Sequence, residues 1–366
     1  MPRFEGLTGS TYEPNFPGLI DNIAREGTPD RCYNLELFHD AELRSAIINR
    51  FELDKGLDKN DPHYHKWALI NFQRFLGFDY VTSYIVGQHW PVHDMATEDL
   101  VEGDMAKDKR WFVDESRGPI TNWEEFEKYP WPDPTASNVT ADLEWFQENL
   151  PEDMCIFLGE IGHYSEFLNW LLGYETLCLS LYDQRDLVEA IRDRVLDYYR
   201  VLMPRVLEFD RIKVFFPSDD MGFKNGTFLS PDDMREFVLP GHKEIAQMAH
   251  DTGRLCILHA CGNLEGIMDD LIHDVKIDAK HSFEDTIEDV REVKHTYGKD
   301  IAILGGMDVD FLCRADEATI RERVRDTLDI CQPGGGYCLG TGNTPANYIP
   351  VDNYLAMVDE GRLYSR

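Results

Sequence analysis

The stretch Cys256-Ile257-Leu258-His259-Ala260-Cys261-Gly262 begins as an apolar, β-prone run and ends in a histidine and a cysteine two residues apart. Short apolar runs bounded by glycine are typical of buried strands. Side chains alternate between the two faces of a strand, so His259 and Cys261 point the same way if strand geometry continues through them. The stretch therefore predicts a buried strand whose carboxyl end carries two metal-binding side chains on one face.

Runs of the same apolar or β-branched type recur along the chain, and most are followed by a stretch with helical periodicity. The eight expected strands are residues 32–38, 78–86, 155–159, 212–217, 256–259, 277–281, 301–305 and 337–340. Strands that alternate with helices form parallel sheets, and eight such units predict an α/β fold of the (β/α)8 TIM-barrel type.

We expect one barrel domain over residues 1–366, with additions at two places. Residues 1–30, rich in Gly, Pro, Asn and Thr, are expected to form an N-terminal arm. Residues 87–150, rich in Trp, Pro and acidic residues, interrupt the alternation between the second and third expected strands. We interpret them as an insertion that walls or covers the barrel mouth as a lid.

The composition excludes several classes of partner. The formal net charge of −32 would repel nucleic acid and anionic membranes. No apolar run reaches the ~18 residues that span a bilayer, and the N-terminus lacks the apolar core of a signal peptide. The eight cysteines are scattered rather than arranged as a disulfide framework, which favours a reducing compartment. The expected location is the cytoplasm.

Polar side chains follow the expected strands at the ends where TIM-barrel active sites lie. They are Glu160, Asp219, Asp220, His259, Cys261, His281 and Asp308, and Cys338 lies within the last strand. We expect Glu160, Asp219 and Asp220 to be catalytic, although an acidic pair such as 219–220 also suits a capped loop. His281, Asp308 and Asn343 are the expected substrate-binding residues.

One imidazole and two thiolates, from His259, Cys261 and Cys338, suit a tetrahedral zinc ion with its fourth position open for chemistry. Seventy-seven residues separate Cys261 from Cys338, so only a large fold could assemble such a site. The alternative is that both cysteines are buried apolar thiols, as free cysteines commonly are.

The sequence resembles the uroporphyrinogen decarboxylase superfamily, and within it the zinc-dependent corrinoid methyltransferase branch. The likeness covers residues 155–360, with a weaker likeness over 31–90. The stretches that carry it are Asp219-Asp220-Met221-Gly222 through Ser230-Pro231, His259-Ala260-Cys261-Gly262, Gly305-Gly306-Met307-Asp308, Gly340-Thr341-Gly342-Asn343 and Leu172-Gly173-Tyr174-Glu175. The resemblance implies a (β/α)8 barrel and a zinc site that maps onto His259, Cys261 and Cys338.

The resemblance also implies a function. In that branch a methyl group moves between a small substrate and the cobalt of a corrinoid, carried here by a separate corrinoid protein. The expected direction is from an O-methyl donor or a similar small substrate to the corrinoid. Methoxylated aromatic compounds are among the candidate donors, because aromatic residues such as Trp90 are frequent near the expected mouth. The close alternative runs from methyl-corrinoid to a thiol of the coenzyme M type. The sequence leaves the oligomeric state open, a homodimer included.

A more distant alternative is a uroporphyrinogen decarboxylase. Members of the superfamily with that activity bind a polycarboxylate tetrapyrrole through an arginine-rich N-terminal segment and need no metal. The corresponding segment here, Arg31-Cys32-Tyr33-Asn34-Leu35-Glu36-Leu37-Phe38, has no arginine cluster. An acidic chain is also a poor partner for a polyanionic substrate. The sequence therefore favours the methyltransferase branch.

Overall fold

The computed structural model of the chain describes residues 3–9, 11–86, 89–97 and 110–364. Their contacts divide the chain into two compact units. Unit 1 consists of Met1–Thr82, Asn149–Phe157 and Asp278–Arg366, and unit 2 consists of Ser83–Glu148 and Leu158–Ile277. The single barrel domain expected over residues 1–366 stays a prediction.

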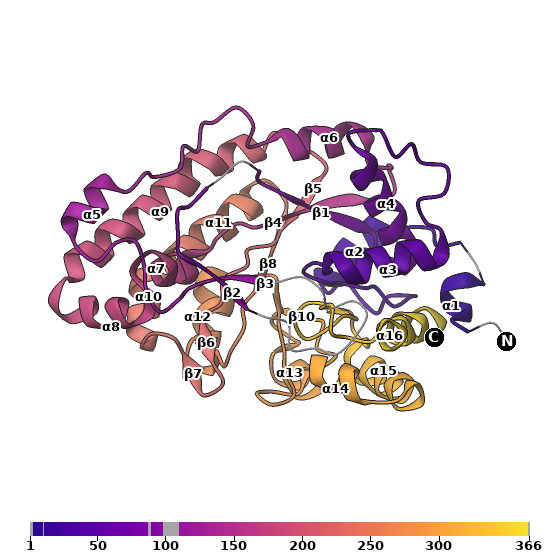
Figure 1. Ribbon diagram of the computed structural model, residues 1–366. Coiled ribbons are helices and arrows are strands. Elements are labelled where there is room, and N and C mark those ends of the chain that lie inside the picture. The colour runs from indigo at the N-terminus through magenta and orange to yellow at the C-terminus, as the bar shows by residue number, and fades with distance from the viewer. Residues whose placement is uncertain (1–2, 10, 87–88, 98–109, 365–366) are drawn as a thin grey trace. The chain divides into compact units, whose positions relative to one another are not determined.

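Seven strands are hydrogen-bonded neighbours in one order (Figure 1). They are β1 (Tyr80–Tyr84), β4 (Cys155–Gly159), β5 (Ile212–Phe215), β8 (Leu255–His259), β9 (Ala279–His281), β10 (Ala302–Leu304) and β11 (Tyr337–Cys338). β5 pairs in parallel with β8, and β10 pairs in parallel with both β9 and β11. Helices follow most of these strands along the chain. The predicted α/β class, with the parallel strands of a TIM-barrel-like fold, is confirmed.

The first expected strand, at residues 32–38, is a single parallel bridge in unit 1 rather than a ladder. Asn34 pairs with Leu339, directly after β11. The segment is also held by a side chain from β1. The Tyr80 hydroxyl donates to the Glu36 carbonyl oxygen at 2.8 Å. The segment therefore lies beside β11. It forms one main-chain bridge and side-chain hydrogen bonds instead of the longer strand that was predicted.

The described part of the N-terminal arm contains two helices, α1 (Glu5–Thr8) and α2 (Phe16–Ile23). The Leu7 amide donates to Asp359 Oδ1 at 3.0 Å, which fastens α1 to α16 (Val351–Leu363), and Figure 1 shows the two helices side by side. The remaining helices of unit 1 are α3 (Ala41–Phe51), α4 (Tyr64–Leu76), α13 (Val290–Tyr297), α14 (Val309–Arg314) and α15 (Glu317–Cys331).

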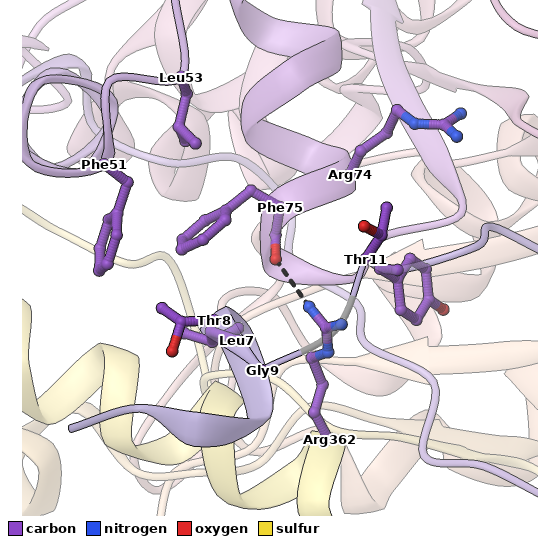
Figure 2. Close-up of a pocket in the computed structure, with 10 residues that line it drawn as sticks. Leu7, Thr8, Gly9, Thr11, Phe51, Leu53, Arg74, Phe75 and Arg362 are labelled. Carbon is purple, nitrogen blue, oxygen red and sulfur yellow. Dashed lines mark hydrogen bonds between the residues drawn. The ribbon is translucent and has the colours of Figure 1, made fainter. Parts of the chain in front are cut away.

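Unit 1 also contains a groove between the arm and the C-terminal helix (Figure 2). Arg362 projects into it and donates through Nη1 to the Phe75 carbonyl oxygen at 3.0 Å. Arg74, also on the wall, pairs with Asp153 at 2.7 Å. The Phe75 carbonyl belongs to the last turn of α4, so Arg362 serves as a cap for that helix.

The described part of the insertion at 87–150 belongs mostly to unit 2. β2 (Asp94–Thr97) and β3 (Arg110–Val113) form an antiparallel pair, followed by α5 (Trp123–Lys128) and α6 (Ala141–Asn149). Trp90 stacks on Phe167 with ring centroids 4.0 Å apart. Residues 87–88 and 98–109 lie outside the described residues, and the role of the insertion as a lid stays a prediction.

Three consecutive helices follow β4, namely α7 (Tyr164–Leu172), α8 (Tyr174–Asp183) and α9 (Arg185–Val206). Gly173 causes the first break, because its φ of 78° is in the left-handed region. A Cβ there would lie 2.6 Å from the Arg117 Cα atom, so the insertion approaches too closely for any other residue.

The other elements of unit 2 are a small hairpin and a series of short helices. They are β6 (Gly222–Phe223), β7 (Gly226–Thr227), α10 (Pro231–Phe237), α11 (Leu239–Asp251), the 3₁₀ turn Glu265–Ile267, α12 (Met268–Asp270) and the π turn Leu271–Val275. Among the described residues, no helix has both the length and the apolar character needed to cross a membrane.

Candidate metal centre

The carboxyl ends of β5 and β8 lie beside each other in unit 2. Their parallel pairing continues past the end of β5, because Ser218 forms a bridge with His259 and the Asp219 amide donates to the His259 carbonyl oxygen at 3.0 Å. This register places the loop that begins at Asp219 next to the sequence His259-Ala260-Cys261. The polar residues that follow these two strands are therefore neighbours.

Asp220, His259 and Cys261 form a cluster that could hold a metal ion. One ligand atom from each lies within 4.8 Å of the other two. Cys261 Sγ is 3.5 Å from His259 Nε2, and Asp220 Oδ1 is 3.6 Å from the same nitrogen. Two ligands of a tetrahedral zinc ion, with bonds of about 2.0–2.3 Å, lie roughly 3.5 Å apart, so the donor atoms and their spacing fit zinc.

The cluster is open on one side. The His259 side chain is 6% exposed, whereas 40% of the Asp220 side chain is exposed and Cys261 is half-buried. A ligand can therefore approach from the side of Asp220 and Cys261, while His259 is held within the protein.

Close contact between the two loops shapes the cluster. Gly262 has a left-handed φ of 92°, and a Cβ there would lie 2.1 Å from the Gly222 carbonyl oxygen. Only glycine fits at position 262 without moving the other loop. The Cys261 amide also donates to Asp220 Oδ1 at 3.0 Å, which orients the carboxylate toward the cluster.

Asp219 is fully buried, and both of its carboxylate oxygens are occupied. The amides of Ser165 and Glu166, in the first turn of α7, each donate to it at 2.9 Å. His242 Nε2 of α11 lies 2.7 Å from Asp219 Oδ2. These bonds tie the end of β5 to two helices and fix the backbone next to Asp220.

Glu160, His163 and Glu166 form a second cluster of titratable groups in unit 2. His163 Nδ1 lies 2.6 Å from Glu166 Oε2, and His163 Nε2 lies 3.5 Å from Glu160 Oε2. Burial lowers the pKa of His163, but its hydrogen bonds to Glu160 and Glu166 outweigh burial and raise that pKa to about 10. The hydrogen bond to His163 keeps the pKa of Glu160 below its usual value, whereas burial raises the pKa of Glu166.

Cys338, the third expected zinc ligand, belongs to unit 1. It lies in β11 with a fully buried thiol, and Asn22 Nδ2 donates to its Sγ at 3.4 Å. Burial raises the pKa of Cys338 well above its usual value. Its part in metal binding stays a prediction.

The three expected substrate-binding residues also belong to unit 1. His281 is fully buried, and its Nε2 lies 3.1 Å from the Thr341 carbonyl oxygen. Asp308 accepts from the Asp285 amide at 2.9 Å and caps the first turn of α14. Asn343 is half-buried in the loop after β11. Their role in binding substrate stays a prediction.

The sequence analysis assigned a different role to one residue of these clusters and did not identify others. Asp220 was expected to be catalytic rather than a metal ligand. The spacing of His163 and Glu166, three residues apart at a helix start, is a local signal that could have paired them. His242 carries no such signal, because its partner Asp219 is distant in the sequence and meets it only in the fold.

Comparison of the sequence with models of known protein families gives one match. The model of the family described as uroporphyrinogen decarboxylase (URO-D) matches residues 119–364, which include both loops of the metal cluster. No curated protein matches the sequence.

Two solved structures are similar over most of their length. One is described as a methyltransferase from Methanosarcina mazei, with a TM-score of 0.65 and 15% identity over 94% of this chain and 97% of that chain. The other is described as a putative vitamin-B12 independent methionine synthase from Listeria monocytogenes, with a TM-score of 0.46 and 12% identity over 92% of this chain and 98% of that chain. The first supports the fold. Because the family model spans more than half of the sequence, the chain belongs to the uroporphyrinogen decarboxylase (URO-D) family.

Proposed function

We propose that this protein is a zinc-dependent methyltransferase. In this proposal it moves a methyl group from the oxygen of a small substrate, such as a methoxylated aromatic compound, to the cobalt of a corrinoid carried by a partner protein. The observation that carries the proposal is the half-open cluster of Asp220, His259 and Cys261 at the ends of β5 and β8. A purely structural zinc site is usually closed by four protein ligands, whereas a catalytic site keeps one position open.

Each residue of the cluster has a definite part in holding the ion. His259 supplies a neutral imidazole nitrogen, and Cys261 and Asp220 supply anionic ligands that balance the charge of a divalent cation. The ion would supply Lewis acidity toward the donor heteroatom. Cys338 is the alternative third ligand, as predicted from the sequence, and would add a second sulfur.

The aromatic side chains near the second cluster favour an aryl substrate. Trp90 stacks on Phe167, and the Phe167 ring centroid is 5.7 Å from that of His163. The Trp170 ring lies 5.6 Å from His163 on the same helix. Flat apolar surfaces of this kind pack well against an aromatic ring.

The close alternative is transfer from methyl-corrinoid to a thiol, in which zinc would bind the acceptor as a thiolate. The same cluster supports both directions. A uroporphyrinogen decarboxylase is the more distant alternative, and it would leave the cluster without a purpose.

Metal analysis and a transfer assay test the proposal. The purified protein should contain about one zinc ion per chain, and Cys261→Ser should lose it, because that substitution removes the only thiolate of the cluster. Cys178→Ser, which changes a half-buried cysteine of α8, is the matched control and should keep the metal.

The assay follows the absorbance of free cob(I)alamin on mixing with methoxylated aromatics, methanol or methylamines. Methylation with a methoxylated aromatic supports the proposal. Methylation of a thiol by methylcobalamin, without the forward reaction, would favour the reverse direction. A zinc-free protein inactive in both directions would contradict the proposal.

A further inference from the structure

We propose that Glu160, His163 and Glu166 form a proton-supply chain that serves the departing heteroatom of the methyl donor. This inference rests on the methyl transfer proposed above and adds the source of the proton. The three residues lie between the end of β4 and the first turn of α7, at the strand ends where active sites of this fold class lie.

The burial of the three residues gives proton transfer a direction, from the buried pair to the exposed Glu160. Glu166 and His163 are joined at 2.6 Å, and their side chains are 17% and 9% exposed. Glu160 lies 3.5 Å from the other imidazole nitrogen and is 53% exposed. The inner pair can therefore store a proton, and Glu160 is the member that a substrate can reach.

The backbone of Glu160 supports a functional role. Its φ of 55° is in the left-handed region, which is strained for a non-glycine residue. Strained residues of this kind cluster at functional sites, where the strain holds a side chain in a required direction. Glu160 holds this backbone conformation with its carboxylate 3.5 Å from His163 Nε2.

The charges around His163 favour the imidazolium form. Carboxylates face both of its ring nitrogens, and Asp219 and Asp220 at the end of β5 add negative charge near Glu166. Tyr199 of α9 contributes a neutral hydroxyl that accepts from the His163 amide at 3.4 Å. The pKa of His163, about 10, agrees with a stored proton, and the lowered pKa of Glu160 agrees with an ionised carboxylate that receives and passes it on.

The adjacent residues Asp219 and Asp220 connect the proton-supply chain to the metal cluster. Asp219 accepts from the amide of Glu166, which anchors the inner carboxylate's backbone. The next residue, Asp220, belongs to the metal cluster. A donor heteroatom held at the open side of the cluster is therefore served from the same part of unit 2.

The proton balance of the step is complete. The methyl carbon–oxygen bond of the donor breaks, both of its electrons stay on oxygen, and the methyl group bonds to the electron pair of the reduced corrinoid. As the bond breaks, the His163 imidazolium passes its Nε2 proton through the ionised Glu160 carboxylate to the oxygen, and neutral His163 then regains a proton from water. The raised pKa of His163 keeps the imidazolium present at neutral pH, and a departing phenolate is basic enough to accept its proton.

The test uses methyl ethers of phenols that differ in acidity, in single-turnover reactions with free cob(I)alamin. The wild type should depend little on the acidity of the leaving phenol. His163→Gln should lose about 10²–10⁴-fold with ethers of weakly acidic phenols and much less with an acidic nitrophenol ether, since the latter needs no proton. Glu244→Gln on α11, which removes an ion pair with Arg200 of α9, should match the wild type.

A second readout does not depend on turnover. NMR titration of the His163 imidazole should show the imidazolium at neutral pH in the wild type and a lower titration midpoint in Glu166→Gln. This measurement also decides the matter if His163→Gln does not fold. A neutral imidazole at pH 7, or equal sensitivity to phenol acidity in wild type and variant, would overturn the proton chain and leave methyl transfer standing. Absence of transfer in the wild type would overturn both.

Discussion

The Asp220 carboxylate accepts a hydrogen bond from the Cys261 amide at 3.0 Å. The same oxygen lies 3.6 Å from His259 Nε2, so one atom joins the two loops and could also bind a metal ion. The loop after β5 and the loop after β8 are consequently arranged together, and a change at Asp220 should affect metal affinity more than overall stability.

Asp220→Asn keeps an oxygen that can accept the Cys261 amide but removes the negative charge. We expect the zinc affinity to fall by at least roughly 10–100-fold, the loss typical even of supporting residues at metal sites. Competition with a chromophoric chelator measures it. Unchanged affinity would show that Asp220 is not a ligand.

Asp219→Asn should act on stability. The Asp219 carboxylate accepts from two backbone N–H groups, one through each oxygen. The substituted side chain has only one acceptor oxygen, so a buried charge-assisted hydrogen bond is lost. We expect a loss of about 2 kcal/mol in the free energy of unfolding, measured by urea denaturation. Asp232→Asn, at a side chain that is 95% exposed, is the control and should change stability by less than about 0.5 kcal/mol.

Glu160→Gly should separate stability from function. Glycine adopts the left-handed φ without strain, but the carboxylate that faces the His163 imidazolium is lost. We therefore expect stability to change by less than about 1 kcal/mol while transfer activity is lost. Glu52, with a φ of 51° at the end of α3, provides a matched control. Glu52→Gly, which loses only an exposed pair with Lys55, should gain about 1 kcal/mol of stability and keep full activity. Equal activity in the two variants would count against a role for the Glu160 side chain.

The pH dependence of stability should carry the signature of Glu36. Burial raises the pKa of this carboxyl from 4.5 to about 8, despite hydrogen bonds from Thr341 that lower it. The folded state therefore binds a proton that the unfolded state releases between about pH 4.5 and 8, and the contribution of Glu36 to stability falls as pH rises through that window. Glu36→Gln should remove this fall in urea titrations at several pH values. An unchanged slope would mean that Glu36 is ionised in the folded protein.

Seven of the eight strands could be predicted because an apolar run between turn residues is a local property of the chain. The segment at 32–38 has the same pattern, but its pairing with Leu339 stops after one bridge while side chains such as Tyr80 make its other contacts. The break between α7 and α8 at Gly173 likewise depends on a contact distant in the sequence, the close approach of Arg117 from the insertion.

The candidate site, like the fold, could be predicted only where the signal is local in the sequence. His259 and Cys261 could be paired from sequence because strand side chains repeat every two residues. Asp220 joins them through the pairing of β5 with β8, which the sequence does not reveal. The buried partners of Asp219, including His242, likewise depend on helix packing rather than on spacing.

Zinc K-edge X-ray absorption on the purified protein tests the central claim most directly. We predict a zinc shell with sulfur at about 2.3 Å and nitrogen or oxygen at about 2.0 Å, and loss of the zinc signal in Cys261→Ser. One sulfur per zinc would support Asp220 as the third ligand, and two would support Cys338. A protein without zinc, or a zinc shell without sulfur, would contradict a metal centre built on His259 and Cys261.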